Sequence, residues 1–374
     1  MRQMKYVMLK DVCTIKMGQS PDSDSYNDNG EGVPFFQGNA DFGERYPVTR
    51  KWCSTPTKMA VPDDILISVR APIGAMNYAK EECCIGRGLA ALTPDKTKVS
   101  PEFIFWLLKG KNAELNSKGT GSTFKAIGRK VLEETKVPDI PLEKQLEYSG
   151  TLEKVYAVIQ HRKSELQMLD NLIKARFVEM FANWKKKYLA EPLGEYLQDI
   201  TYGFTNPMPD AEEGPWKITA KDVVNGIVNL DTARKTSQES YDKLTEKSKP
   251  QLGDVLLTKD GTLGRTAVVE IGGMCVNQSV AVLRINKKIL PKYLSILLQM
   301  PKYQRDMIAD AGGGTIKHIY ITKVVKMPIV VPSIEEQNTF LDFVHQVDKS
   351  KVAVQKALEE MQLLFDSLMQ QYFG

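Results

Sequence analysis

The chain has 374 residues, 42% hydrophobic and 26% charged, which is typical of an ordinary globular protein long enough for two domains. Its net charge of +4 is compatible with nucleic-acid binding but too small to indicate it alone. No run reaches the roughly eighteen apolar residues of a membrane span, and the N-terminus has no signal-peptide pattern, so we expect no membrane partner.

Cysteine usage indicates the redox compartment. The five cysteines, at positions 13, 53, 83, 84 and 275, form no Cys-x-x-Cys pair. An odd number of cysteines at such spacings predicts reduced thiols and a cytoplasmic location. No paired Cys and His spacing predicts a metal site.

The first half of the chain predicts a β-rich domain. Runs of β-branched residues bounded by Gly and Asp are typical of short strands, and a proline early in an apolar segment is typical of a helix start. In chain order we expect an opening turn (Lys16–Pro21), a strand start (Glu31–Phe35), a strand (Pro62–Arg70), a turn (Ile73–Ala75), a return strand (Leu89–Leu92), a short helix (Pro101–Lys109) and a glycine-rich turn (Gly119–Lys125).

A long helix is predicted next, over Glu143–Phe181. Its apolar residues recur at alternating spacings of three and four, which is the heptad seam of a coiled coil. Arg162 and Arg176 fill two skipped seam positions. A helix of this length would extend roughly 60 Å.

The second half repeats these elements in the same order. The matching segments are Thr201–Pro207, Glu213–Trp216, Leu252–Lys259, Leu263–Arg265, Val280–Ile285, Pro291–Leu298, Gly312–His318 and a second long helix over Glu335–Phe373. Aligning Gln145 with Gln337 pairs the two long helices without gaps. An ordered repeat of this kind indicates two copies of one structural unit.

The two long helices are expected to pack on each other, because one helix cannot bury a seam alone. The interruptions fit such a pair, since Arg162 corresponds to Val354 and Lys351 to Ile159. The alternative is that each helix packs separately on its own domain. The predicted seam consists of Leu152, Val155, Ile159, Leu166, Leu169, Ile173, Met180, Val344, Val347, Val354, Leu358, Met361, Phe365, Leu368 and Tyr372.

Catalytic motifs are missing. The sequence has no P-loop, no glycine-rich dinucleotide turn and no Asn-Pro-Pro-aromatic tetrad of an amino-methyltransferase, and Asn206–Pro209 is only a distant imitation. The three histidines lie apart in sequence, and His161 and His345 fall where a solvated helix face is expected. We therefore expect no catalytic residues, and no cofactor or metal, in this chain.

The duplicated motifs resemble the specificity subunits of type I restriction–modification systems. The resemblance rests on Gly253–Thr258, with Asp63–Ser68 as its looser twin, on the following Gly turns, and on the Glu-x-Gln entry to each long helix. In the first copy Lys144 replaces the second acidic residue. The similarity covers nearly the whole chain.

The resemblance implies an α+β fold with an internal pseudo-two-fold repeat. It implies target recognition domains over 1–142 and 185–333, separated by antiparallel coiled-coil helices over 143–184 and 334–374. The implied function is recognition of a bipartite, asymmetric DNA site, with adenine methylation and restriction carried out by partners. Those partners would be two modification subunits and restriction subunits, which would hold S-adenosylmethionine, ATP and Mg²⁺.

Candidate DNA-contacting residues follow from chemistry, because base edges are read by forked or amide side chains and phosphates by cations, hydroxyls and backbone N–H groups. In the first half the candidates are Lys16, Gln19, Ser20, Gln37, Asn39, Arg70, Ser122, Thr123 and Lys125. In the second half they are Thr205, Asn206, Lys217, Lys221, Lys259, Arg265, Thr315, Lys317 and His318.

Two other functions remain open at this point. One is the specificity partner of a different restriction system, working as a half-subunit, although the complete duplication argues against a half. The other is a coiled-coil scaffold that binds protein partners through two β-rich domains. Steep salt dependence would favour DNA binding over a scaffold.

Overall fold

The computed structural model describes residues 5–121, 125–181, 188–309 and 318–374. The chain divides into two compact units. Unit 1 contains residues 1–164 and 354–374, and unit 2 contains residues 165–353. This division cuts through both long helices, because each end of the helix pair packs with a different globular part.

The globular part of unit 1 is built on short strands. Its elements are β1 (Tyr6–Met8), α1 (Leu9–Val12), β2 (Cys13–Met17), η1 (Ser23–Ser25), β3 (Tyr26–Asn27), β4 (Val33–Phe36), η2 (Asn39–Asp41), β5 (Trp52–Cys53), β6 (Met59–Ala60), β7 (Ile65–Ser68), β8 (Met76–Tyr78), β9 (Cys83–Ile85), β10 (Leu89–Pro94), α2 (Pro101–Gly110), α3 (Asn112–Ser117), α4 (Arg129–Glu133) and β11 (Lys136–Pro138). One sheet has the order β2-β10-β7-β8 and another the order β3-β5-β4-β9-β6.

Unit 2 repeats this plan. Its elements are β12 (Glu191–Pro192), η3 (Leu193–Tyr196), β13 (Leu197–Tyr202), β14 (Ala211–Ile218), η4 (Ala220–Asp222), β15 (Val223–Val224), β16 (Ile227–Val228), β17 (Arg234–Lys235), α7 (Gln238–Asp242), η5 (Glu246–Ser248), β18 (Val255–Thr258), β19 (Thr266–Val268), β20 (Met274–Val276), β21 (Val280–Ile285), α8 (Pro291–Gln299), α9 (Pro301–Ala309), α10 (Ile321–Lys326) and β22 (Pro328–Ile329). Its sheet β13-β21-β18-β19 corresponds strand for strand to β2-β10-β7-β8.

The predicted repeat is confirmed at the level of strand register. Leu89 lies opposite Ser68 in the β10–β7 pair, and Val280 lies opposite Thr258 in the β21–β18 pair. Both strand pairs are antiparallel, and β7 and β18 are buried at every residue, which explains their continuous apolar sequence. The short helices α2 and α8 begin with proline as predicted.

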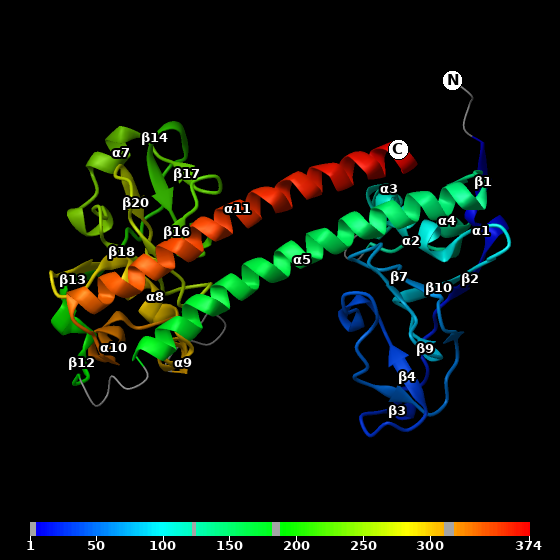
Figure 1. Cartoon of the computed structure of the whole chain (residues 1–374), viewed down its shortest axis with the longest axis horizontal. Helices are drawn as coiled ribbons and strands as arrows, with labels where there is room; N and C mark the ends of the chain where they lie inside the picture. Colours follow the sequence, from blue (N-terminus) through cyan, green and yellow to red (C-terminus); the bar gives the residue numbers. More distant parts are fainter. Residues whose placement is uncertain (1–4, 122–124, 182–187, 310–317) are drawn as a thin grey trace. The chain divides into compact units, whose positions relative to one another are not determined.

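The two long helices are α5 (Leu142–Phe181) and α11 (Ile334–Phe373), each an uninterrupted helix of 40 residues (Figure 1). Their predicted bounds are confirmed to within one residue at the start. His161 and His345 are exposed on them, as expected.

Within unit 1, the start of α5 packs antiparallel against the end of α11. Leu152 and Ile159 are buried in one cluster with Phe365, and Trp106 of α2 joins the same cluster. The Tyr148 and Tyr372 rings stack with centroids 4.0 Å apart. The helices therefore pack both on each other and on the globular part, so the alternative of separate packing is wrong.

Within unit 2, the end of α5 packs antiparallel against the start of α11. Phe177 and Phe340 meet edge to face with centroids 5.4 Å apart, in a cluster with Ile173 and Val344. Lys351 interrupts the seam and pairs with Asp170 at 2.5 Å.

Every predicted seam residue is buried or half-buried, but the seam drifts at one end. Phe177 is buried at 3% exposure, although the heptad placed its neighbour Arg176 in the seam; Arg176 is half-buried, lies over the Phe343 ring and pairs with Glu179. The physical reason is that an α-helix has 3.6 residues per turn, so a strict heptad drifts away from the buried face. The prediction also missed Phe340, which is fully buried.

Glu-x-Gln at the start of each long helix is explained by a buried glutamine. Gln145 accepts a hydrogen bond from the Ser100 backbone N–H, and its amide donates to the Lys98 and Ile140 carbonyls. Gln337 accepts from the Leu290 N–H and donates to the Lys288 and Pro332 carbonyls. Each glutamine thus joins the long helix to the loop before α2 or α8.

Candidate nucleic-acid interface

Three turns meet at one end of the strands in unit 1. Gly18 and Gln19, in the opening turn after β2, donate backbone N–H groups to the carbonyls of Leu89 and Ile85. The turn Gly86–Gly88 between β9 and β10 is held by the end of β4, because the Gly86 N–H donates to the Phe36 carbonyl. The Arg87 N–H donates to the Ser20 hydroxyl at 3.3 Å.

Glycine is required where these turns touch. A Cβ atom on Gly18 would lie 2.2 Å from the Gly86 carbonyl oxygen, and one on Gly88 would lie 2.4 Å from the Gln37 carbonyl oxygen. Backbone oxygens at such distances leave no room for any side chain. These glycines therefore allow a close-packed cluster of backbone, from which the neighbouring side chains project.

Unit 2 builds the same cluster with different residues. Phe204 N–H donates to the Val276 carbonyl, and Asn277 N–H donates to Ile218, which matches the Gln19–Ile85 and Gly86–Phe36 bonds of unit 1. A Cβ atom on Gly203 would lie 1.7 Å from the Val276 oxygen. We call these two sets of three turns the turn clusters: residues 18–20, 37–41 and 86–88 in unit 1, and residues 203–205, 219–222 and 277–279 in unit 2.

Several sequence-predicted candidates of unit 1 fall within its turn cluster. Gln19 and Gln37 are exposed there, and Ser20 and Asn39 are half-buried. Arg70 and Lys125 are exposed beside each other, because Arg70 pairs with Ala126 in a β-bridge. Lys16 instead lies in β2, and its ammonium donates to the Met59 carbonyl at 3.1 Å. Ser122 and Thr123 lie outside the described residues.

In unit 2 most of the described candidates lie in two places, and Lys217 lies apart from both. Thr205, Asn206 and Lys221 are exposed in or beside the turn cluster. Lys259 and His318 lie together, since Asp260 forms a β-bridge with His318 and Lys259 pairs with Asp260 at 2.7 Å. Arg265 is half-buried after β18. Thr315 and Lys317 lie outside the described residues.

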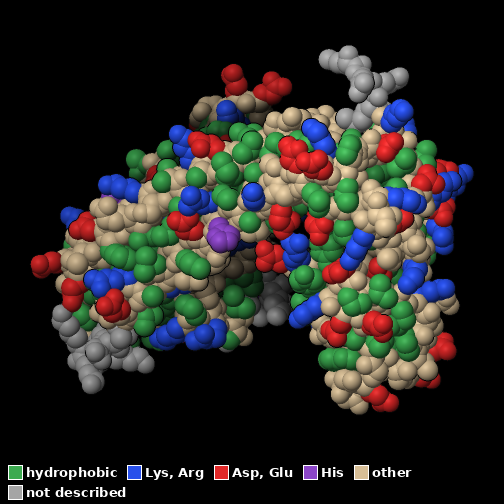
Figure 2. Space-filling model, turned by 45° about the vertical axis from the view of Figure 1, so that its right-hand side comes forward, with side chains coloured by type: hydrophobic (Ala, Val, Ile, Leu, Met, Phe, Trp, Pro, Cys, Tyr) green, Lys and Arg blue, Asp and Glu red, His purple; other side chains and the backbone are tan. Residues whose placement is uncertain are grey.

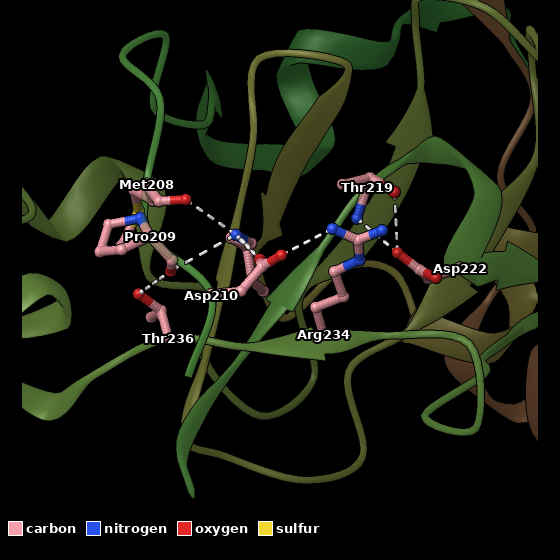
Figure 3. A network of polar contacts seen from close by, with 8 residues as sticks. Met208, Pro209, Asp210, Thr219, Asp222, Arg234 and Thr236 are labelled. Carbon is pink, nitrogen blue, oxygen red and sulfur yellow. Dashed lines mark hydrogen bonds and ion pairs between the residues drawn. The ribbon is translucent and has the colours of Figure 1, made fainter. Parts of the chain in front are cut away.

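The largely buried Lys217 side chain joins a polar network that reaches the exposed Asp210 and Arg234, both labelled in Figure 3. Its ammonium donates to the Met208 carbonyl at 2.9 Å and pairs with Asp210, which also binds Arg234 at 2.6 Å. Hydrogen bonds from Lys217 and then Arg234 hold the pKa of the Asp210 carboxyl below its usual value. The geometry gives Lys217 a role in positioning the segment that follows Asn206.

A groove of about 510 Å³ opens beside the turn cluster of unit 2. Its lining includes Tyr202, Phe204, Thr205, Asn206 and Lys247. These are hydroxyl, amide, aromatic and cationic groups, the types that contact phosphate, sugar and bases.

On the face drawn in Figure 2, charge is dispersed rather than concentrated. Figure 2 shows Lys and Arg side chains interspersed with Asp and Glu over the visible face, without one continuous basic patch. This agrees with the net charge of +4.

All five cysteines are free and buried. Burial raises the pKa of the Cys13 and Cys83 thiols to about 12, so they are protonated. No group of three or more His, Cys, Asp or Glu residues in the described ranges could hold a metal ion, and none of the described helices has the apolar length to cross a membrane.

Sequence reasoning missed the residues at the tips of the turn clusters. Arg87 stands between two glycines, and Gln278 occupies the corresponding position between Asn277 and Ser279; both side chains are exposed. The Gly-Arg-Gly triplet between two strands was a usable signal for the first. No sequence signal near Gln278 indicated a role for it. Its position becomes evident only when the two units are compared.

The chain is similar to known proteins along most of its length. A sequence model described as the type I restriction modification DNA specificity domain matches residues 1–169 and 205–361. The type I restriction enzyme EcoBI specificity subunit of Escherichia coli is 22% identical over 98% of this chain and 85% of its own length.

A more similar relative matches over a shorter stretch. The putative type I restriction enzyme MjaX specificity subunit of Methanocaldococcus jannaschii is 44% identical over 42% of this chain, and the match spans 37% of that relative. The crystal structure of a type I restriction-modification S subunit from M. genitalium shares the fold, with 16% identity, a TM-score of 0.56, and coverage of 100% of this chain and 97% of that one. The chain therefore belongs to the family of type I restriction–modification DNA specificity subunits.

Proposed function

We propose that this chain recognises a bipartite, asymmetric site in double-stranded DNA and directs partner subunits to it. The observation that carries this proposal is the pair of turn clusters, which share one backbone arrangement but present different side chains. Two turn clusters with the same backbone arrangement and different exposed side chains would recognise two different half-sites. Loops held by a rigid scaffold are the usual carriers of such recognition.

The long helices α5 and α11 would set the distance between the half-sites. Each has 40 residues and so a length of about 60 Å. Half-sites about one to two turns of DNA apart would fit such a spacer, because one turn is about 34–36 Å. The coil would act as a ruler, independent of which bases each turn cluster reads.

Catalysis would belong to partners. Two modification subunits would transfer methyl groups from S-adenosylmethionine to adenine, and restriction subunits would use ATP and Mg²⁺. The role of this chain would be to position the partner subunits on DNA. Its turns offer hydrogen-bonding side chains and phosphate-binding groups for that role.

The decisive experiment maps methylated adenines in DNA from cells that carry this chain and its candidate methyltransferase. The control is the same strain without this chain. We expect a two-part asymmetric motif only when this chain is present. If an active methyltransferase yields no new motif, the proposal fails.

Salt dependence of binding separates DNA recognition from a protein scaffold. Affinity of the purified chain for duplex DNA should fall steeply between 50 and 200 mM salt, because phosphate contacts release counterions. Contacts made by apolar surfaces would not weaken in that way.

A further inference from the structure

Within the described residue ranges, each turn cluster has one side chain at an equivalent position that lacks a hydrogen-bond or ion-pair partner in the chain. In unit 1 it is the guanidinium of Arg87, and in unit 2 it is the carboxamide of Gln278. Arg87 follows Gly86 at the end of β9, and Gln278 follows Asn277 at the end of β20. Both residues lie in the two-residue turn that leads into the next strand, β10 or β21. Among the described residues, neither side chain makes a hydrogen bond or an ion pair within the chain.

Corresponding backbone hydrogen bonds hold the turns that carry Arg87 and Gln278. Leu89 N–H donates to Gly86 and Val280 N–H donates to Asn277, each at 3.0 Å. Val69 N–H donates to Gly88 and Lys259 N–H donates to Ser279. The turn is therefore fixed on both sides in both units, while the side chain at its tip remains available to a ligand.

The reinforcement of the turn differs between the units. In unit 1 it is steric, because the neighbours of Arg87 are glycines that touch other backbone. In unit 2 it is polar, because the Ser279 hydroxyl donates to the Asn277 side chain and accepts from the Ala220 N–H at 3.1 Å. The same turn is thus held by close glycine packing in unit 1 and by side-chain hydrogen bonds in unit 2. This indicates that the fixed position of the residue at the turn, Arg87 or Gln278, is important for function.

The chemistry of the two tips is that of base readout. A guanidinium fork pairs with the O6 and N7 atoms of guanine, and a carboxamide pairs with the N6 and N7 atoms of adenine, in the major groove. Such a pair needs a fixed backbone behind it, since the side chain must reach two atoms at once. Both turns supply that backbone.

We propose that Arg87 and Gln278 are equivalent specificity-determining residues, Arg87 reading a guanine in one half-site and Gln278 an adenine in the other. This inference rests on the proposed function, because it assigns bases within the bipartite site. It separates these two residues from the lysines of the turns, which would contact phosphates and carry no sequence information.

The test uses the full chain together with its methyltransferase and a library of DNA sites with single-base changes. For Arg87→Ala, we expect discrimination at one guanine of one half-site to fall by about 5- to 150-fold, with the other half-site unchanged. For Gln278→Ala, we expect the same loss at one adenine of the other half-site. Circular dichroism and thermal unfolding would establish that each variant is folded.

Three further variants test the interpretation. Arg87→Lys keeps the charge but loses the fork, so it should lose discrimination while the salt dependence of binding stays unchanged. Arg129→Ala removes the same side chain from an exposed position on α4, where Arg129 pairs with Glu133 at 2.7 Å, and should leave the motif intact. Gln238→Ala, on α7, is the matched control for Gln278.

The outcomes distinguish this inference from the proposed function. A wild-type bipartite motif that survives Arg87→Ala or Gln278→Ala at every base overturns the assignment of that residue and leaves the proposed function standing. A wild-type chain that directs no motif overturns both. Loss of discrimination at one base per variant supports the assignment.

Discussion

Gln145 accepts a hydrogen bond from the Ser100 backbone N–H at 3.0 Å, deep in unit 1. The contact joins the start of a long helix to the cap of the short helix α2, and Gln337 makes the same contact with Leu290 in unit 2. Both glutamines are almost fully buried. The repeated glutamine is therefore an architectural feature that fixes each globular part to its helix.

Replacing this glutamine should destabilise the protein. Gln145→Ala leaves the Ser100 N–H and two carbonyls without their partner, and an unsatisfied buried group costs about 1–3 kcal/mol. Urea unfolding would measure this loss. Gln167→Ala, at an exposed position on the same helix, should change the free energy of unfolding by less than about 0.5 kcal/mol. Equal effects of the two substitutions would contradict the role of Gln145.

Asp63→Gly should stabilise the first globular part. Asp63 has a φ of 70°, and its twin Gly253 has a φ of 86°, so the turn needs the left-handed conformation in both copies. Relief of the side-chain penalty is worth about 1 kcal/mol. Among the described residues, the Asp63 carboxylate pairs with Lys96 alone, an exposed ion pair that contributes little to stability. A lower melting temperature in the glycine variant would refute this explanation of the departure from the Gly-Asp motif.

Two glycine-to-alanine substitutions should act in opposite directions. Gly150 lies within α5, where an added Cβ meets nothing within 4 Å, so Gly150→Ala should stabilise by about 0.5–1 kcal/mol. Gly203→Ala would place a Cβ against the Val276 carbonyl and should destabilise by about 1–3 kcal/mol or more. Differential scanning calorimetry of both variants checks the pair, and stabilisation by Gly203→Ala would be incompatible with the turn cluster.

Buried thiols should make stability fall at alkaline pH. The pKa of Cys13 and of Cys83 is raised by burial from 9.0 to about 12. Because the folded state keeps these thiols protonated, their stabilising effect is complete below about pH 9 and is lost as the pH rises towards 12. Comparing urea unfolding of the wild type and a Cys13→Ala, Cys83→Ala double variant at pH 7 and pH 10 isolates this effect. If both proteins lose the same stability, the thiols are not responsible.

Lengthening both long helices should lengthen the spacer of the DNA site. One added heptad in each helix extends the coil by about 10.5 Å, or about three base pairs, while keeping the seam in phase. The insertions would follow Ser164 in α5 and Ala353 in α11, where the two units divide. Methylation mapping should show unchanged half-sites with a longer spacer. An unchanged spacer would disprove the ruler, and an insertion in one helix alone is the control that disrupts the seam.

Much of the fold could be predicted because its signals are local or repeated. Residues close together in sequence were enough to predict several elements. The heptad spacing predicted α5 and α11, an early proline predicted α2 and α8, and continuous apolar runs predicted the buried strands β7 and β18. The repeat then predicted two copies of one unit. The predicted seam departs from the structure near Phe177, where the 3.6-residue turn of the helix brings a residue outside the heptad to the buried face. It also left out Phe340, which precedes Val344 by four residues and extends the same seam.

The candidate interface could be predicted only in part. Gln19, Ser20, Gln37 and Asn39 were found because turns with amide and hydroxyl side chains are visible in the sequence. Lys16 and Lys217 have the same chemistry, but their ammonium groups bind carbonyls inside the fold. Whether a lysine faces a carbonyl or solvent depends on segments distant in sequence.

The sequence alone determined the duplicated architecture, the coiled coil and the lack of recognisable cofactor motifs, because periodicity and motif order are properties of the chain itself. Only the tertiary structure brought Arg87 beside Ser20, 67 residues away, and made Gln278 its counterpart. The reason is that backbone hydrogen bonds and glycine contacts between distant turns fix those tips, and such contacts leave no periodic signal in the sequence.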